Sequence, residues 1–120
     1  MASLLLKFIF WILCGVVVVL SLLPANQLPP ATLDVWDKAQ HALGFALLTT
    51  AGLMAYPRPS ARLAGGLLLL GAGIELAQSL TTWRQGDGWD WLADAIGIAF
   101  VMLIAHQCKR KRQPVPTQHR

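Results

Sequence analysis

The sequence predicts an all-α membrane protein, a bundle of four transmembrane helices. Hydrophobic residues make up 55% of the 120 residues and charged residues only 13%, about half the charged share of a soluble domain. Four apolar segments each approach the roughly 17 to 25 residues that cross a hydrocarbon core. They cover residues 4–23, 39–56, 63–80 and 91–107. Helices are the expected spanning structure because four strands are too few to close a barrel.

The basic residues predict the orientation of these helices. With the N-terminus inside, four spans leave only Lys38 and Arg84 outside. The basic residues then on the cytoplasmic side are Lys7, Arg58, Arg62, Lys109, Arg110, Lys111, Arg112 and Arg120. The opposite orientation would violate the positive-inside rule. We therefore expect both termini to be cytoplasmic, with residues 1–107 forming one membrane domain and residues 108–120 a basic tail.

The first apolar segment, residues 4–23, is predicted to be a lipid-facing helix. Its apolar run is long for a cleaved signal peptide, and no Ala-x-Ala site follows Leu23. Cys14 lies within this segment and Cys108 follows the fourth, so a disulfide between them is not expected. Residues 24–32 contain three prolines and predict an extended outer loop, because proline cannot continue a helix.

The second segment opens with a polar turn. Asp37 and His41 are four residues apart, and Lys38, His41 and Phe45 follow the spacing of one helix face. Residues 56–62 contain two prolines and predict a tight cytoplasmic turn.

The third and fourth segments combine small residues with acidic ones. Gly73 and Ala77 form a pair of small residues four apart that permits close helix approach, so the third span is expected to pack centrally. Glu75, one turn inside this span, is a functional candidate because ionisable groups are costly in a membrane. Its alternative role is an ion pair with Lys38 or Arg84.

Four tryptophans, Trp36, Trp83, Trp89 and Trp91, fall at the outer ends of the spans. An aromatic belt at the membrane interface is the simplest interpretation of them.

Antiparallel spans bring the polar residues of the second, third and fourth segments to one outward-facing level. We expect Arg84 to be the main counter-charge of the acidic residues there. Charges at one membrane face do not make a path across it, so a transporter is not favoured. The expected ligand-binding residues are Asp37, Lys38, His41, Glu75, Gln78, Arg84, Asp87, Asp90 and Asp94.

Three roles suit this polar set. The first is recognition of an envelope lipid or glycolipid headgroup, with Arg84 and Lys38 on phosphate. The second is a divalent metal ion, since Asp, Glu and His supply suitable ligands; the candidate ligands are His41, Glu75, Asp87 and Asp90. The third is a purely structural network. His41 or Glu75 could act as a catalytic general base, although no activated nucleophile is recognisable.

Three sequence pieces together resemble the VanZ-like family of small bacterial membrane proteins. They are D-K-x-x-H-x-x-x-F at residues 37–45, G-x-E-x-x-Q at residues 73–78 and R-x-x-D-x-x-D-x-x-x-D-x-x-G at residues 84–97. The family usually has asparagine at the position of Asp94. The resemblance implies a multi-span membrane protein, and the family's namesake is associated with low-level resistance to the glycopeptide teicoplanin.

The preferred expectation is an inner-membrane protein whose outer pocket binds or modulates an envelope lipid, glycolipid or peptidoglycan-related ligand. The alternative is a membrane enzyme that acts on a lipid-linked phosphate with a divalent cation. Nucleic acid is not an expected partner despite the net charge of +4, because the basic residues form no face among aromatic residues.

Overall fold

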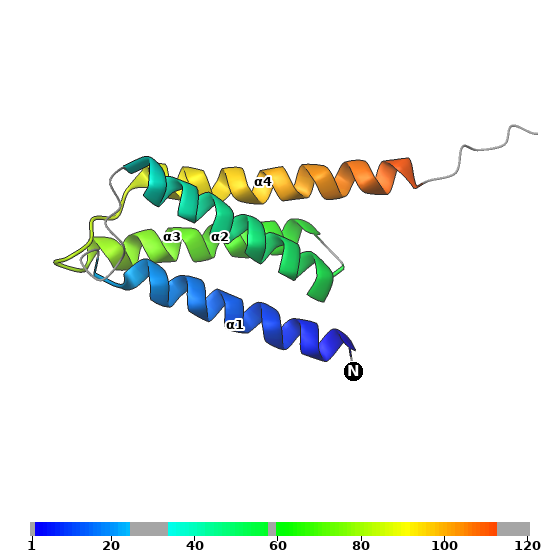
Figure 1. Cartoon of the computed structure of the whole chain (residues 1–120), viewed down its shortest axis with the longest axis horizontal. Helices are drawn as coiled ribbons and strands as arrows, with labels where there is room; N and C mark the ends of the chain where they lie inside the picture. Colours follow the sequence, from blue (N-terminus) through cyan, green and yellow to red (C-terminus); the bar gives the residue numbers. More distant parts are fainter. Residues whose placement is uncertain (1, 25–33, 58–59, 113–120) are drawn as a thin grey trace, which may run out of the picture.

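The structure is a computed structural model that describes residues 2–24, 34–57 and 60–112. These residues form four helices and no strand: α1 (Ala2–Leu22), α2 (Asp34–Ala55), α3 (Ser60–Ser79) and α4 (Gly88–Lys111). Successive helices run in opposite directions, so the start of α1 and the end of α4 lie at the same end of the molecule (Figure 1). The prediction of an all-helical protein is confirmed for the described residues.

Each helix begins before its predicted apolar segment, and α4 also ends beyond it. α2 begins at Asp34, and α3 begins at Ser60, inside the stretch predicted to be a turn. α4 continues to Lys111, so the helix extends into the predicted basic tail of residues 108–120. Hydropathy marks only the part of a helix suited to lipid, whereas capping residues and good helix formers such as Lys and Arg set its ends. The predicted loop at residues 25–32 lies outside the described residues.

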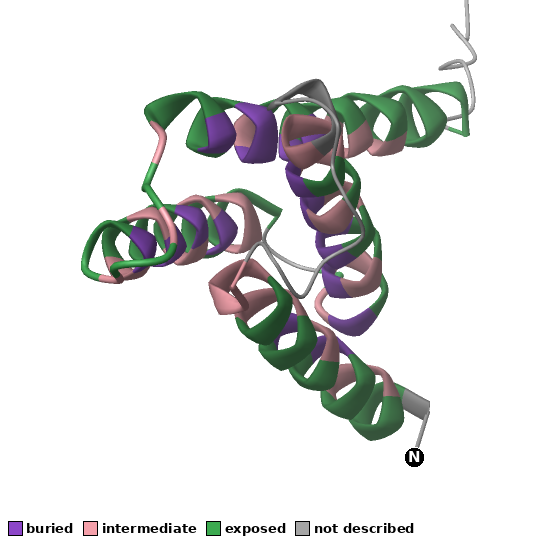
Figure 2. Cartoon of the chain, turned by 60° about the vertical axis from the view of Figure 1, so that its left-hand side comes forward, coloured by how far each residue is buried: buried purple, intermediate pink, exposed green. Residues whose placement is uncertain are grey.

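Three of the four helices, α1, α3 and α4, are long and apolar enough to cross a membrane. α2 has a similar length but a polar first part, which contains Asp37, Lys38, Gln40 and His41. Exposed residues, green in Figure 2, occur along all four helices. Many of them are large and apolar, among them Leu4, Phe8, Leu69, Leu76, Phe100 and Leu103. Soluble proteins rarely expose apolar patches of this extent. These are the properties of a helical membrane protein.

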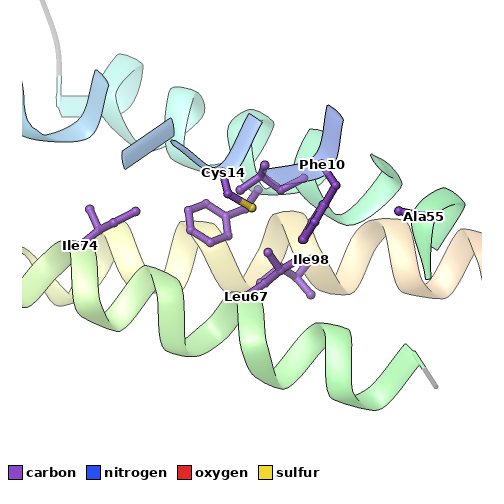
Figure 3. Packing of buried hydrophobic residues seen from close by; sticks show 8 residues of the cluster. Phe10, Cys14, Ala55, Leu67, Ile74 and Ile98 are labelled. Carbon is purple, nitrogen blue, oxygen red and sulfur yellow. The ribbon is translucent and has the colours of Figure 1, made fainter. Parts of the chain in front are cut away.

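α2 is the most extensively packed helix and contacts α1, α3 and α4. α3 also contacts the three other helices, in agreement with the prediction that the third span packs centrally, while the described parts of α1 and α4 do not pack against each other. Phe45 and Leu48 of α2 are fully buried. They belong to a core cluster that includes Phe10 and Cys14 of α1, Leu67 and Ile74 of α3, and Ile98 of α4 (Figure 3). Both cysteines are free, as expected.

The closest approach of α2 and α4 is at Gly97. A Cβ atom placed there would overlap the backbone carbonyl of Ala42. Since a glycine is required for this contact, Gly97 sets the separation of the two helices. By contrast, a Cβ at Gly73 would meet no atom within 4 Å. The expectation that Gly73 marks a helix contact is therefore wrong: spacing identifies small residues but not the direction in which they face.

Candidate functional site

A buried histidine–aspartate pair lies where α2 and α4 meet. His41 Nδ1 is 2.9 Å from Asp94 Oδ1, and the two residues are 7% and 0% exposed. Ala42 follows His41, and Gly97 lies three residues after Asp94, so the close helix contact holds the pair together. Asp94 Oδ2 is buried without a hydrogen-bond partner.

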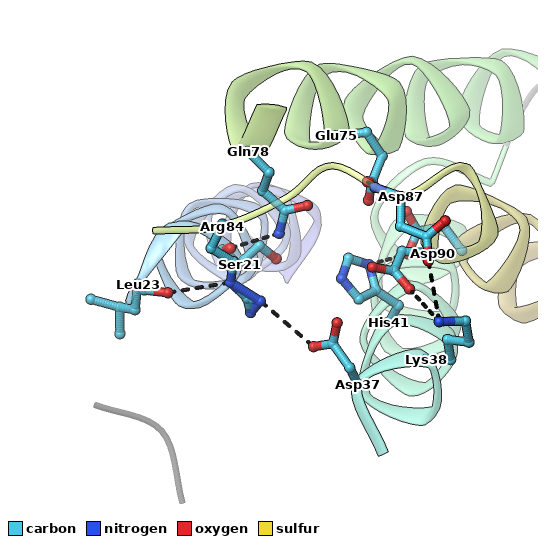
Figure 4. Close-up of polar contacts among 11 residues, drawn as sticks. Ser21, Leu23, Asp37, Lys38, His41, Glu75, Gln78, Arg84, Asp87 and Asp90 are labelled. Atoms are coloured by element: carbon cyan, nitrogen blue, oxygen red, sulfur yellow. Dashed lines mark hydrogen bonds and ion pairs between the residues drawn. The ribbon is translucent and has the colours of Figure 1, made fainter. Parts of the chain in front are cut away.

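Lys38 is the main counter-charge of the α4 carboxylates (Figure 4). Its Nζ atom lies 3.3 Å from Asp87 Oδ2 and 3.4 Å from Asp90 Oδ1. Arg84, expected in this role, instead lies 3.6 Å from Asp37 Oδ1. The expectation for Arg84 is therefore wrong. The reason is the rotation of α2, which turns Lys38 toward α4 and Asp37 toward the α3–α4 connection.

Glu75 of α3 is held by the backbone rather than by a cation. Its Oε2 atom accepts a hydrogen bond of 2.7 Å from the backbone N–H of Asp87, and its Oε1 atom is buried without a partner. A Cβ at Gly86 would overlap the carbonyl of Glu75, so glycine lets the connection fold this close to α3. Among the described residues, neither Lys38 nor Arg84 forms an ion pair with Glu75.

The last carbonyls of α1 accept hydrogen bonds from three side chains at the end of α3 and in the α3–α4 connection. The donors are Gln78 Nε2 to Ser21 O at 2.7 Å, Trp83 Nε1 to Leu22 O at 3.1 Å, and Arg84 Nε to Leu23 O at 3.4 Å. Carbonyls at a helix C-terminus have no partner within their own helix. This set, the α1 latch, was not predictable because backbone acceptors leave no sequence signal.

Three of the four tryptophans predicted at the interface have described side chains, and all three are exposed: Trp83, Trp89 and Trp91. The Trp91 indole N–H also donates to the carbonyl of Leu68, 3.0 Å away in the middle of α3. Trp91 therefore also links α4 to α3. The side chain of Trp36 lies outside the described residues.

Asp87 caps α4. Its Oδ1 atom accepts a 3.0 Å hydrogen bond from the backbone N–H of Trp89, as an N-cap residue does. This bond lowers the pKa of the Asp87 carboxyl below its ordinary value, and the ammonium of Lys38 lowers the pKa further. The ionised carboxylate therefore stabilises the folded protein.

This lowered pKa gives a testable pH dependence. A group with a depressed folded-state pKa contributes stability above its unfolded pKa and loses it as the pH falls through the folded pKa. We expect Asp87→Asn, which keeps a capping oxygen, to be less stable than wild type near pH 7. The difference should shrink as the pH falls below the ordinary value of 3.8. Melting temperatures in detergent across this range measure it; a constant difference would contradict the assignment.

Two sets of three side chains have the spacing of metal ligands, and both contain His41. They are Asp37, His41 and Asp90, and His41, Glu75 and Asp94; in each set the ligand atoms lie within 4.8 Å of one another. Asp87, a predicted metal ligand, belongs to neither set among the described residues, since it caps α4. Asp94 takes part in its place.

A cavity of about 420 Å³ opens beside this cluster, between α1 and α2. One part is polar, with Asp37, Gln40, His41 and Arg84, and the rest is mainly apolar. The apolar lining comes from Val17, Leu20, Leu43, Gly44 and Phe45. Sequence reasoning missed Gln40, which its place in the polar turn beside His41 could have indicated. It also missed the α1 residues, which carry no polar signal.

The nine predicted ligand-binding residues thus divide into four sets of contacts. His41, Glu75 and Asp94 approach one another, Lys38 joins Asp87 to Asp90, and Arg84 lies beside Asp37. Gln78 joins the α1 latch. No protein-family model matches the chain, and neither a curated protein nor a solved structure matches it. The geometry of this site is therefore the basis for its function.

Proposed function

We propose that this protein is a VanZ-like inner-membrane protein that binds a phosphate-bearing envelope lipid, glycolipid or lipid-linked peptidoglycan precursor. The observation that carries this proposal is the cavity between α1 and α2, whose lining combines charged and polar side chains with apolar ones. Such a ligand has the same two parts: a polar headgroup and a hydrocarbon chain.

The apolar part of the cavity orients the chain of the ligand. Val17, Leu20, Leu43 and Phe45 form a surface along which an acyl or prenyl chain can lie. Within a bilayer this contact adds little affinity, because the surrounding lipid tails are as apolar as the cavity wall. Selectivity must therefore come from the headgroup.

Arg84 is the residue best placed to bind phosphate. Its guanidinium is largely enclosed, with a side chain 10% exposed, and its nearest carboxylate, Asp37, is 3.6 Å away. Within the described residues, only the Nε–H of its guanidinium donates a hydrogen bond, a long one to Leu23 O. A guanidinium carries several N–H donors, so others can make a charge-assisted bond to phosphate. Lys38, also expected on phosphate, is engaged by Asp87 and Asp90. Asp37 and Gln40 can bind sugar hydroxyl or amine groups.

The orientation follows from charge and helix order. With α2 as a fourth span, the positive-inside rule places the cavity on the extracytoplasmic side and both termini in the cytoplasm. The basic last turn of α4, Lys109–Lys111, lies at the opposite end of the molecule from the start of α2 and the α3–α4 connection (Figure 1), the segments that contain Lys38 and Arg84. This separation supports a multi-pass protein whose site faces outward.

The test is lipid retention by an Arg84→Ala variant. Removing a charge-assisted hydrogen bond costs about 1.5 to 3 kcal/mol, so we expect roughly 10- to 100-fold weaker binding. Native mass spectrometry of gently purified protein, followed by identification of the retained lipid, measures this. Arg110→Ala, at the exposed end of α4, is the matched control. Equal retention by both variants would refute the role of Arg84.

The cellular consequence of this proposal is a change in glycopeptide tolerance. If the ligand is a lipid-linked precursor, Arg84→Ala should lower teicoplanin tolerance at equal expression, while Arg110→Ala should leave it unchanged. Susceptibility assays in a deletion strain complemented with each variant distinguish the two.

A further inference from the structure

We infer that His41, Glu75 and Asp94 form a binding site for a first-row divalent cation such as Zn²⁺. The three residues come from α2, α3 and α4, so one ion would join the outer ends of three helices. His41 also lines the cavity, but the lipid proposal depends on Arg84, which is not a ligand of this metal site.

The separation of the three side chains suits a single ion. One ligand atom from each residue lies within 4.8 Å of the other two. Two atoms bound at about 2.1 Å to one zinc ion lie at most about 4.2 Å apart. Small side-chain rotations therefore suffice to close the site around an ion.

Two buried carboxylate oxygens point to a missing partner. Asp94 Oδ2 and Glu75 Oε1 are both buried without a hydrogen-bond partner, although the second oxygen of each carboxylate is satisfied. Asp94 is fully buried. An unsatisfied buried charged group is costly, and these two oxygens belong to residues of the same ligand set. A cation bound to both would remove the cost.

The local charge balance also favours a divalent ion. Among the described residues, the lysine and the arginine near this site face other carboxylates: Lys38 lies beside Asp87 and Asp90, and Arg84 lies beside Asp37. Glu75 and Asp94 are left with His41 alone. Two ionised carboxylates and a neutral imidazole carry two negative charges, which one divalent cation neutralises. The alternative set of Asp37, His41 and Asp90 lacks this deficit because its carboxylates already face Lys38 or Arg84.

Glycine on α3 keeps space open beside the proposed ion. A Cβ at Gly71 would lie 2.7 Å from Asp94 Oδ2. That oxygen therefore faces α3, one turn before Glu75. An alanine at this position would fill the space next to a proposed ligand atom without removing any ligand.

The ligand types indicate the metal. Magnesium and calcium prefer sites made of oxygen atoms alone, whereas imidazole nitrogen favours zinc and its neighbours in the first transition row. One nitrogen and two carboxylate oxygens therefore suit Zn²⁺, with Mn²⁺ expected to bind more weakly.

The test is a zinc titration of the full chain in detergent, after chelator treatment and with any affinity tag removed. We expect one Zn²⁺ per chain by native mass spectrometry, and X-ray absorption that reports one imidazole among oxygen ligands. Both Glu75→Gln and Gly71→Ala should weaken zinc binding at least about 10-fold. The first variant removes a metal ligand and the second disturbs the packing around one, and changes of this kind typically cost that much metal affinity. Gly73→Ala, where a Cβ has open space, should bind as wild type does.

Testing both Glu75→Gln and Gly71→Ala guards against misfolding as the cause of weaker zinc binding. Their melting temperatures without metal show whether each is folded, and zinc should raise the melting temperature of wild type and Gly73→Ala more than that of either variant. No zinc bound to wild-type protein, or wild-type affinity in both folded variants, would overturn the inference. Lipid and zinc give different mass increments, so this inference and the lipid proposal can fail separately.

Discussion

Replacing His41 with alanine should lower the free energy of unfolding by about 3 to 5 kcal/mol, which is the usual cost of removing one partner of a buried pair. The substitution leaves Asp94 fully buried with neither oxygen paired. Reversible unfolding in mixed detergent measures the change. His106→Ala is the control, because His106 is exposed on α4 and exposed substitutions usually change stability by less than about 0.5 kcal/mol.

A double-mutant cycle separates the pair from its surroundings. Asp94→Ala should also destabilise the protein, but the double variant should be more stable than the sum of the two changes predicts, because it leaves no unpaired charge. A coupling of about 0.5 to 3 kcal/mol is expected for residues in contact. Additive changes, or a His41→Ala variant as stable as His106→Ala, would show that the hydrogen bond contributes nothing to the fold.

Gly97→Ala should destabilise the protein by about 1 to 3 kcal/mol, the cost of overpacking a close contact. The added Cβ overlaps the carbonyl of Ala42, so α2 and α4 must separate and His41 must move away from Asp94. Alanine otherwise favours a helix by up to about 1 kcal/mol over glycine. A net loss of stability would therefore show that the steric overlap with Ala42 outweighs the higher helix propensity of alanine.

The matched control for Gly97 is Gly73→Ala. The Cβ at residue 73 has open space, so this variant should be as stable as wild type or more stable. Thermal melting in detergent gives both values, and zinc binding should weaken in Gly97→Ala alone. An unchanged or higher melting temperature for Gly97→Ala would mean that the helices are not fixed by this contact.

The location of the site follows from the sequence, whereas its pairings do not. Antiparallel apolar segments require the polar ends of α2, α3 and α4 to meet, so the position of Glu75 and His41 at one level could be predicted. Which cation faces which carboxylate depends on how each helix rotates about its axis. That rotation is set by contacts such as Gly97 with Ala42, which hydropathy does not encode.

The fold has the same division between predictable and unpredictable features. Length and composition are sufficient to indicate α1, α3 and α4 as membrane helices. They do not indicate that α2, the least apolar of the predicted spans at its outer end, is the most extensively packed helix. A polar turn lowers hydropathy, but here it is also where the helix makes its most specific contacts, through Lys38 and His41. The family resemblance rests on these same positions and remains a proposal.

The α1 latch implies an order of assembly in the membrane. α1 is synthesised first, yet the donors that bind its last carbonyls, Gln78, Trp83 and Arg84, come from later in the chain. α1 can pack against α2 as soon as α2 has been synthesised, because the two helices are in contact. Its last carbonyls gain these three donors only after α3 and the α3–α4 connection have been synthesised. Because Arg84 also lines the cavity, the cavity is completed at that same late step.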